Sequence, residues 1–257
     1  MAFVGVGRAH ADKNGRTAGR EQPCPVAKQW ARELADASPW TPPPVTTVVV
    51  AAHPDDEVLA TGGIIGHQSD HGIDVHLVAA TDGEAAYDSL PRAFDIGALR
   101  RAEQERAMAA LGVARSRVRR VGLPDGQVSG HENALADAIV EECRRTGCEL
   151  LVAPWLFDDH PDHEACGRAA AAAAATLRID LVYGLFWVWH RGPVDAFADC
   201  RLLRLEMSDV QVRRRAGALT HHRSQLTTDI VAVPMLSSAD AEPICWPAEY
   251  YVAGPVR

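Results

Sequence analysis

The chain has 257 residues, of which 47% are hydrophobic and 23% are charged, and its formal net charge is −8 at pH 7. This size and composition predict a globular α/β domain with a substantial core. The acidic balance argues against nucleic acid or anionic membranes as partners, because phosphate groups bind to basic surfaces. The sequence lacks the run of about 20 apolar residues that a membrane-spanning helix requires. We therefore expect a cytoplasmic protein whose partners are small molecules.

Six cysteines are scattered along the chain without a C-x-x-C pair or a regular spacing. This pattern is typical of reduced thiols rather than of a disulfide framework, which agrees with a cytoplasmic location. The sequence leaves open whether the protein forms a homo-oligomer.

The sequence predicts that residues 1–44 precede a single domain over residues 45–257. Up to residue 25 the chain is rich in Gly, Ala and charge without apolar periodicity, which predicts a flexible tail. Apolar side chains at a spacing of four then predict a short helix over residues 26–37 that docks on the main domain. A proline-rich linker follows over residues 38–44.

The main domain begins with a β-branched run at residues 45–50, which predicts a buried parallel strand. Further strands are expected at residues 74–80, 118–121, 149–153, 181–189 and 200–207. Helices are expected at residues 62–71, 96–111, 132–145, 163–177 and 210–221, and loops with short extended pieces from residue 227. This alternation predicts a Rossmann-like three-layer α/β/α sandwich with a largely parallel sheet, in which ligands bind beyond the carboxyl ends of the strands.

The first cluster of ionisable side chains, His53-Pro54-Asp55-Asp56-Glu57, directly follows the first strand. Zinc takes imidazole nitrogen and carboxylate oxygen, and a catalytic zinc has three protein ligands and one open position. His53 and Asp56 are therefore candidate ligands. Alternatively, the carboxylates only complement the positive end of a helix whose first turn holds Pro54.

The second cluster, Asp158-Asp159-His160-Pro161-Asp162-His163, has the same context at the end of another strand. Parallel strands bring such ends together, so this cluster can complete a His-Asp-His metal triad although 110 positions separate His53 from His163. The alternative is a capping aspartate, Asp162, beside two surface histidines. The shared architecture of the two clusters favours the metal site.

The two clusters resemble the metal motifs of the PIG-L/LmbE-like deacetylases. The resemblance rests on A-H-P-D-D-E, on T-D-G-E after the second strand and on P-W-x-x-D-D-H-P-D-H. It extends through R-x-x-E from Arg100, L-P-D-G around Asp125 and a basic helix that ends in Ser-Gln at Gln225. It spans roughly residues 45–225 and does not cover the first 40 residues.

The resemblance implies an LmbE-like fold and a zinc-dependent hydrolase. The implied reaction removes the acetyl group of an N-acetylglucosamine-type amino sugar, on a small glycoside or a secondary-metabolite intermediate such as one of antibiotic biosynthesis. The implied metal ligands are His53, Asp56 and His163. Zn²⁺ is the expected cofactor, and Fe²⁺ is an alternative for the same ligands.

The resemblance also implies the catalytic residues. Asp55 is expected to be the general base. His160 is expected to stabilise the oxyanion or to protonate the leaving amine, with Asp162 orienting it. Arg100 is expected to contact the substrate. The sequence leaves open whether Asp55 or His160 is the general acid.

Other polar residues carry weaker signals. Asp82 and Glu84 follow the second strand and are candidate sugar contacts, although a turn with an exposed Glu is equally expected. Asp158 and Asp159 are candidate partners for a metal-bound imidazole, or solvated loop carboxylates.

Aromatic and histidine residues near the end of the chain favour structural roles. Trp187, Trp189 and His190 can stack on a sugar face, but they alternate along the expected strand, which favours core packing. The pair His221-His222 is interpreted as helix-end histidines that complement the helix dipole.

Two other functions remain open, a metallohydrolase of a different amide or ester and a metal-binding module without catalysis. Metal binding alone does not require Asp55 beside the ligands, which argues against the second. Dinucleotide binding is disfavoured because Thr61-Gly62-Gly63 is not a G-x-G-x-x-G turn.

Overall fold

The structure is a computed structural model that describes residues 25–87, 89–91, 93–193 and 195–254. The tail predicted up to residue 25 lies outside the described residues, except for its last residue. None of the helices in the described part of the chain has the length and apolarity needed to cross a bilayer.

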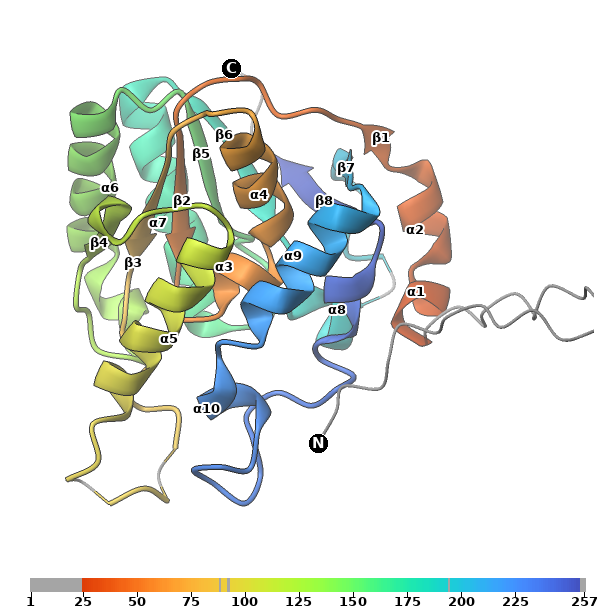
Figure 1. Ribbon diagram of the computed structural model, residues 1–257. Helices are drawn as coiled ribbons and strands as arrows, with labels where there is room; N and C mark the ends of the chain where they lie inside the picture. Colours follow the sequence, from red (N-terminus) through yellow and green to blue (C-terminus); the bar gives the residue numbers. More distant parts are fainter. Residues whose placement is uncertain (1–24, 88, 92, 194, 255–257) are drawn as a thin grey trace, which may run out of the picture.

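One sheet of eight strands runs through the molecule in the order β1-β7-β8-β6-β5-β2-β3-β4 (Figure 1). The strands are β1 Ser38–Pro39, β2 Thr47–Ala51, β3 Val75–Ala79, β4 Val118–Arg120, β5 Leu150–Pro154, β6 Asp180–Gly184, β7 Leu202–Glu206 and β8 Ala248–Ala253. Among these strands β8 alone is antiparallel to its neighbours. The predicted, largely parallel sheet is confirmed.

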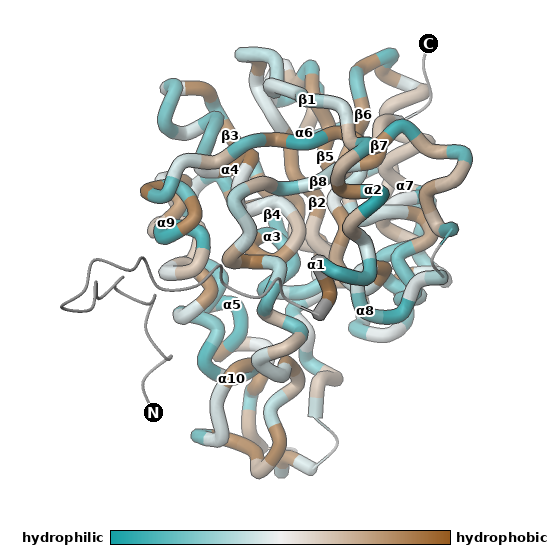
Figure 2. Tube along the Cα trace, turned by 90° about the vertical axis from the view of Figure 1, so that its right-hand side faces the viewer, coloured by the Kyte–Doolittle hydropathy of each residue, from teal (hydrophilic) through white to brown (hydrophobic). Residues whose placement is uncertain are grey.

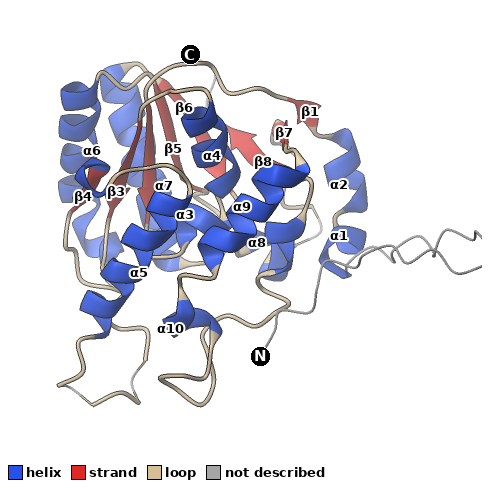
Figure 3. Cartoon of the chain, viewed as in Figure 1, coloured by secondary structure: helices blue, strands red, loops and turns tan. Residues whose placement is uncertain are grey.

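Helices cover both faces of the sheet (Figure 3). They are α1 Pro25–Gln29, α2 Ala31–Asp36, α3 Asp56–Leu59, α4 Gly62–Asp70, α5 Ile96–Ala110, α6 Glu132–Thr146, α7 Pro161–Leu177, α8 Val188–Arg191, α9 Asp209–Leu219 and α10 Arg223–Leu226. Short 3₁₀ segments are η1 Arg115–Arg117, η2 Val128–His131 and η3 Glu242–Cys245.

The side chains of β2 explain the three layers. Val48 and Val50 belong to the core shared with α6 and α7, whereas Val49 and Ala51 belong to the core shared with α4, α5 and α9. Successive strand residues point to opposite faces, so an uninterrupted apolar strand requires helices on both sides. The predicted α/β/α sandwich is therefore confirmed.

The segment before the main domain docks as predicted, but as two short helices, α1 and α2. Trp30 between them is fully buried, and its indole N–H donates to the carbonyl of Trp189 at 2.9 Å. Part of the expected linker also joins the sheet, because Ser38 and Pro39 pair with β7.

One prediction about the last third of the chain is wrong. The strand expected over residues 181–189 ends at Gly184, and the chain turns into α8, because the Asp158 carboxylate accepts the backbone N–H groups of residues 186–188. The tail expected as loops with short extended pieces contains β8, and the structure adds that this strand lies inside the sheet, between β6 and β7. Its buried Glu249 accepts from the N–H groups of Gly63 and Ile64 and from Arg215.

The sheet order places the candidate site. β2 pairs with both β3 and β5, all parallel, so the segments that follow these strands leave the sheet at the same edge. The two predicted clusters follow β2 and β5. They are therefore neighbours in space, as the strand-end argument expects.

Candidate active site

The first cluster is held in a tight turn between β2 and α3. The Thr81 hydroxyl donates to the carbonyl of Ala52 at 2.8 Å and ties this turn to the end of β3. Asp55 has a φ of 134°, a conformation that residues other than glycine rarely adopt and that is often found at functional sites. Its backbone N–H donates to the buried carboxylate of Glu57 at 3.1 Å. Asp55 and Asp56 both line one cavity as a result.

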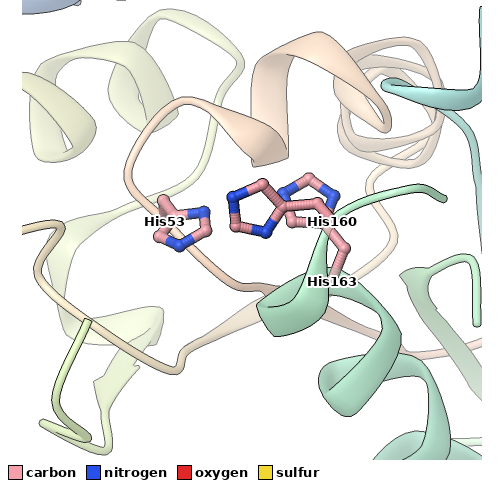
Figure 4. Close-up of side chains that lie close together, drawn as sticks. All are labelled: His53, His160 and His163. Carbon is pink, nitrogen blue, oxygen red and sulfur yellow. The ribbon is translucent and has the colours of Figure 1, made fainter. Parts of the chain in front are cut away.

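The predicted metal ligands converge on Asp56. One oxygen of Asp56 lies 3.4 Å from Nδ1 of His53, and the other lies 3.2 Å from Nε2 of His163, in the first turn of α7. Nε2 of His163 is buried without a hydrogen-bond partner among the described residues. Nitrogens of His53, His160 and His163 also lie within 4.8 Å of one another (Figure 4).

The opposite ring nitrogens of the two predicted histidine ligands are held by carboxylates. Nε2 of His53 lies 3.2 Å from both Asp162 and Asp125. Nδ1 of His163 lies 2.8 Å from Asp158. Metal-binding histidines usually have such a partner on the second nitrogen, which fixes the tautomer and the ring orientation.

Asp162 is placed differently from the expectation. Its carboxylate contacts His53 and accepts the backbone N–H groups of Gly126 at 2.7 Å and Val128 at 3.1 Å. Nδ1 of His160 is buried and has no hydrogen-bond partner in the described part of the chain. In the structure Asp162 thus contacts His53, and its orientation of His160 stays a prediction.

The electrostatics of the cluster favour a cation. Burial lowers the pKa of His53, but Asp125 and Asp162 outweigh it and raise that pKa well above its usual value. Burial likewise opposes protonation of His163, whereas Asp56 and a second carboxylate raise its pKa to about 9. Imidazole and carboxylate donors in this buried, negatively charged setting are the donor set of a zinc site. The residues thus fit a divalent metal.

Asp55 lies beside the candidate ligands and against Arg100. Burial raises the pKa of Asp55 to about 6, although Arg100 opposes the shift. The guanidinium of Arg100 lies 3.5 Å from the Asp55 carboxylate and donates to the carbonyls of Pro54 at 2.9 Å and Gly83 at 3.0 Å. Gly83 has a φ of +66°, and a Cβ there would collide with Arg100. The predicted substrate contact of Arg100 stays a prediction, and the structure adds a contact with Asp55.

His160 also lines the site, and its imidazole is neutral. Burial, with the neighbouring His163 and His53, lowers its pKa to about 4. Its ring lies nearly parallel to that of Trp187, with centroids 6.5 Å apart. A donor role for His160 therefore relies on the single N–H of the neutral ring, not on an imidazolium.

The cavity at this site has a volume of about 230 Å³. Its walls include the predicted residues His53, Asp55, Asp56, Arg100 and His160. They also include Trp187, which the sequence offered as a possible sugar contact, and Asp125, Gln225, Met235 and Leu236, which the sequence did not identify as site residues. Asp125 and Gln225 stood within the motifs that carry the family resemblance, but no chemical role singled them out. A larger cavity of about 690 Å³ lies at the other edge of the sheet, beside Leu150 and Leu181, away from the ionisable clusters.

The two weaker candidate sugar contacts do not line this cavity. Asp82 forms ion pairs with Arg101 at 2.6 Å and Arg120 at 3.2 Å. Glu84 is exposed and accepts from the backbone N–H of Asp125 at 2.9 Å. Their sugar-binding role stays a prediction, and the structure shows them joining neighbouring elements.

His222 lies at a helix end, as predicted, but at the N-cap of α10, where it does not complement a helix dipole. It is fully buried, and its Nε2 lies 3.0 Å from the carboxylate of Glu57. The other oxygen of Glu57 accepts from the backbone of Asp55 and from Gln104. His222 thus belongs to the buried network beneath Asp55.

Asp158→Asn is expected to weaken metal binding by about 10- to 100-fold. The carboxylate accepts from Nδ1 of His163 and from the backbone of Trp187, and an amide nitrogen in place of that oxygen would face these donors. Competition with a chromophoric chelator measures the change. Asp159→Asn is the matched control, since Asp159 is exposed with a φ of 59° that Asn tolerates. Equal affinities of the two variants would contradict the role given to Asp158.

Comparison with known proteins assigns the family. Residues 48–174 match the family model described as PIG-L, GlcNAc-PI de-N-acetylase. The 1D-myo-inositol 2-acetamido-2-deoxy-alpha-D-glucopyranoside deacetylase of Mycobacterium sp. (strain KMS) is 30% identical over 213 residues, which cover 70% of this chain and 67% of that protein. The diacetylchitobiose deacetylase of Thermococcus kodakarensis is 30% identical over 201 residues, which cover 70% of this chain and 70% of that protein.

A solved structure shows the same fold. The A40926 pseudoaglycone deacetylase Dbv21 superimposes with a TM-score of 0.64 at 19% identity, over 81% of this chain and 96% of that one. Together with the sequence matches, this confirms the resemblance that the two His/Asp motifs indicated. The chain belongs to the PIG-L/LmbE family of deacetylases, and it is a hydrolase of that family.

Proposed function

We propose that this protein removes the acetyl group from an N-acetylglucosamine-type amino sugar by metal-dependent hydrolysis. The two relatives named above deacetylate a 2-acetamido-2-deoxyglucoside and diacetylchitobiose, which supports a sugar of this type. The observation that carries the proposal is the convergence of His53 and His163 on Asp56, in a cavity that also presents Asp55. Zinc is our choice of metal and Fe²⁺ the alternative, because imidazole and carboxylate suit both.

The residues around the metal position supply the proton transfers. His53, Asp56 and His163 would hold a divalent ion, which would polarise an acetyl carbonyl and lower the pKa of water. Asp55 faces the same cavity, so its carboxylate is placed to accept a proton from the attacking water. Arg100 contacts this carboxylate and holds its orientation. His160 lies on the same wall and donates an N–H to the developing oxyanion. The newly protonated Asp55 then protonates the leaving amine, since the neutral ring of His160 carries no acidic proton.

Gln225 and Trp187 are proposed as sugar contacts. Oε1 of Gln225 is buried on the cavity wall without a hydrogen-bond partner among the described residues, so it is free to accept from a hydroxyl or the acetamido N–H. Trp187 is half-buried on the same wall and presents an aromatic face suited to a sugar ring.

Metal analysis followed by an amine-release assay tests this function. The purified protein is expected to hold one zinc or iron per chain and to release amine from N-acetylglucosaminides. A chelator is expected to remove the activity, and added zinc to restore it. Turnover that is indifferent to the chelator, or no turnover across a panel of N-acetylglucosaminides, would contradict the proposal.

A further inference from the structure

Two loops far apart in the sequence form the mouth of the cavity. One connects β3 to α5 and the other connects α10 to η3, and they project side by side from the lower end of the molecule (Figure 1). The hydroxyl of Tyr87, on the first loop, donates to the carbonyl of Ser224 at 2.8 Å. It also accepts the backbone N–H of Met235, on the second loop, at 2.9 Å. We call the described residues of these two loops, 80–87, 89–91, 93–95 and 227–241, the rim.

The second loop of the rim contains a long apolar segment, whereas the first loop also carries charged residues such as Asp82 and Glu84. Residues 230–236 form an uninterrupted run of seven apolar residues, Ile-Val-Ala-Val-Pro-Met-Leu. Val233 in this run is 77% exposed and Met235 is 45% exposed, while Phe94 on the other loop is 41% exposed. These are three of the five exposed large hydrophobic residues in the described part of the chain, and Figure 2 shows the hydrophobic colouring of the rim. Exposed apolar patches of this kind mark binding sites.

The size and the continuity of the cavity indicate what the rim binds. Its volume of about 230 Å³ is below the roughly 300–1,000 Å³ that encloses a drug-sized ligand. A single sugar therefore fills it, and any group joined to that sugar lies outside, against the rim. Met235 both lines the cavity and is exposed, and Leu236 lines the cavity beside it, so one apolar surface continues from the cavity to the rim.

We propose that the rim binds an apolar aglycone, and that the substrates are N-acetylated amino sugars joined to such a group. Tyr87 acts as a positioning residue, because its hydroxyl fixes the apolar loop relative to the cavity. The apolar run carries no charged residue, which favours a neutral aglycone over a charged one. This inference rests on the proposed deacetylation.

The test compares hexyl and methyl N-acetylglucosaminides of the same anomeric linkage, with the metal-loaded full chain. The wild type is expected to favour the hexyl glycoside by about tenfold in kcat/KM, through KM, as the burial of one apolar side chain provides. Val233→Ser and Tyr87→Phe are each expected to reduce this preference to about twofold, with kcat for the hexyl glycoside nearly unchanged.

Tyr183→Phe is the matched control for Tyr87→Phe. The Tyr183 hydroxyl is buried on β6 without a hydrogen-bond partner among the described residues, so its removal is expected to leave the preference intact. Equal wild-type kcat/KM for the two glycosides would overturn the inference. So would a Tyr87→Phe effect of the same size on both glycosides.

Calorimetry and light scattering separate aglycone binding at the rim from catalysis and from self-association. If neither glycoside is turned over, the proposed function fails. Calorimetry then tests separately whether the rim binds the apolar aglycone. If the wild type binds the hexyl glycoside more tightly than the methyl glycoside and Val233→Ser removes this difference, aglycone binding at the rim is supported. Equal binding of the two glycosides by the wild type overturns it. Light scattering tests a second copy of the chain as the occupant. A wild-type dimer that Val233→Ser converts to a monomer, with the preference unchanged, would overturn the aglycone assignment.

Discussion

His163→Ala is expected to abolish metal binding and deacetylation together. The imidazole is buried, and its Nε2 lies 3.2 Å from the Asp56 carboxylate, so its removal takes a donor out of the middle of the cluster. The remaining ligands, His53 and Asp56, leave two protein donors where a catalytic zinc site has three. Mass-spectrometric metal analysis after dialysis, with the amine-release assay, measures both losses.

His71→Ala is the control for this prediction. His71 is exposed at the end of α4, so the same truncation there is expected to leave metal content and turnover unchanged. Circular dichroism shows whether each variant is folded. A folded His163→Ala protein that retains stoichiometric zinc would contradict the ligand assignment.

The parts of the fold that repeat a local pattern were predictable. β2 and β5 are buried at every position, and each precedes one of the two clusters of ionisable residues, so both the parallel sheet and the edge that holds the site follow from the sequence. β8 was not predictable, because it follows an irregular segment and contains Glu249. That glutamate is compatible with a buried strand only because Arg215 and the first turn of α4 neutralise it.

The candidate site also has parts that the sequence predicts and parts that it does not. The convergence of His53, Asp56 and His163 was predictable, because both clusters follow parallel strands, and their role as metal ligands stays a prediction. The contact between Asp162 and His53 was not predictable. The orientation of the Asp162 carboxylate is fixed by the backbone N–H groups of Gly126 and Val128, which only folding brings close to it. His222 was predicted as a helix-end histidine that complements the dipole, and only the buried carboxylate of Glu57, 165 positions away, explains its burial.

Asp55→Asn is expected to keep the fold and the metal but to lower kcat by about 10²- to 10⁴-fold, the usual contribution of general acid–base catalysis. The substitution preserves side-chain size, and asparagine tolerates positive φ better than most residues, so the turn that holds Asp56 is expected to persist. The backbone N–H that donates to Glu57 is also retained. The amide cannot accept the proton of the attacking water, so the loss falls on the chemical step.

Metal content, KM and kcat measured on the same Asp55→Asn preparation separate catalysis from ligation. A base role predicts stoichiometric metal and a KM close to the wild-type value, because the amide fills the same place on the cavity wall. A structural role through Arg100 predicts a lowered melting temperature instead, since the guanidinium loses its buried counterion. Near-normal kcat with full metal would remove Asp55 from the reaction and assign the proton transfers to His160.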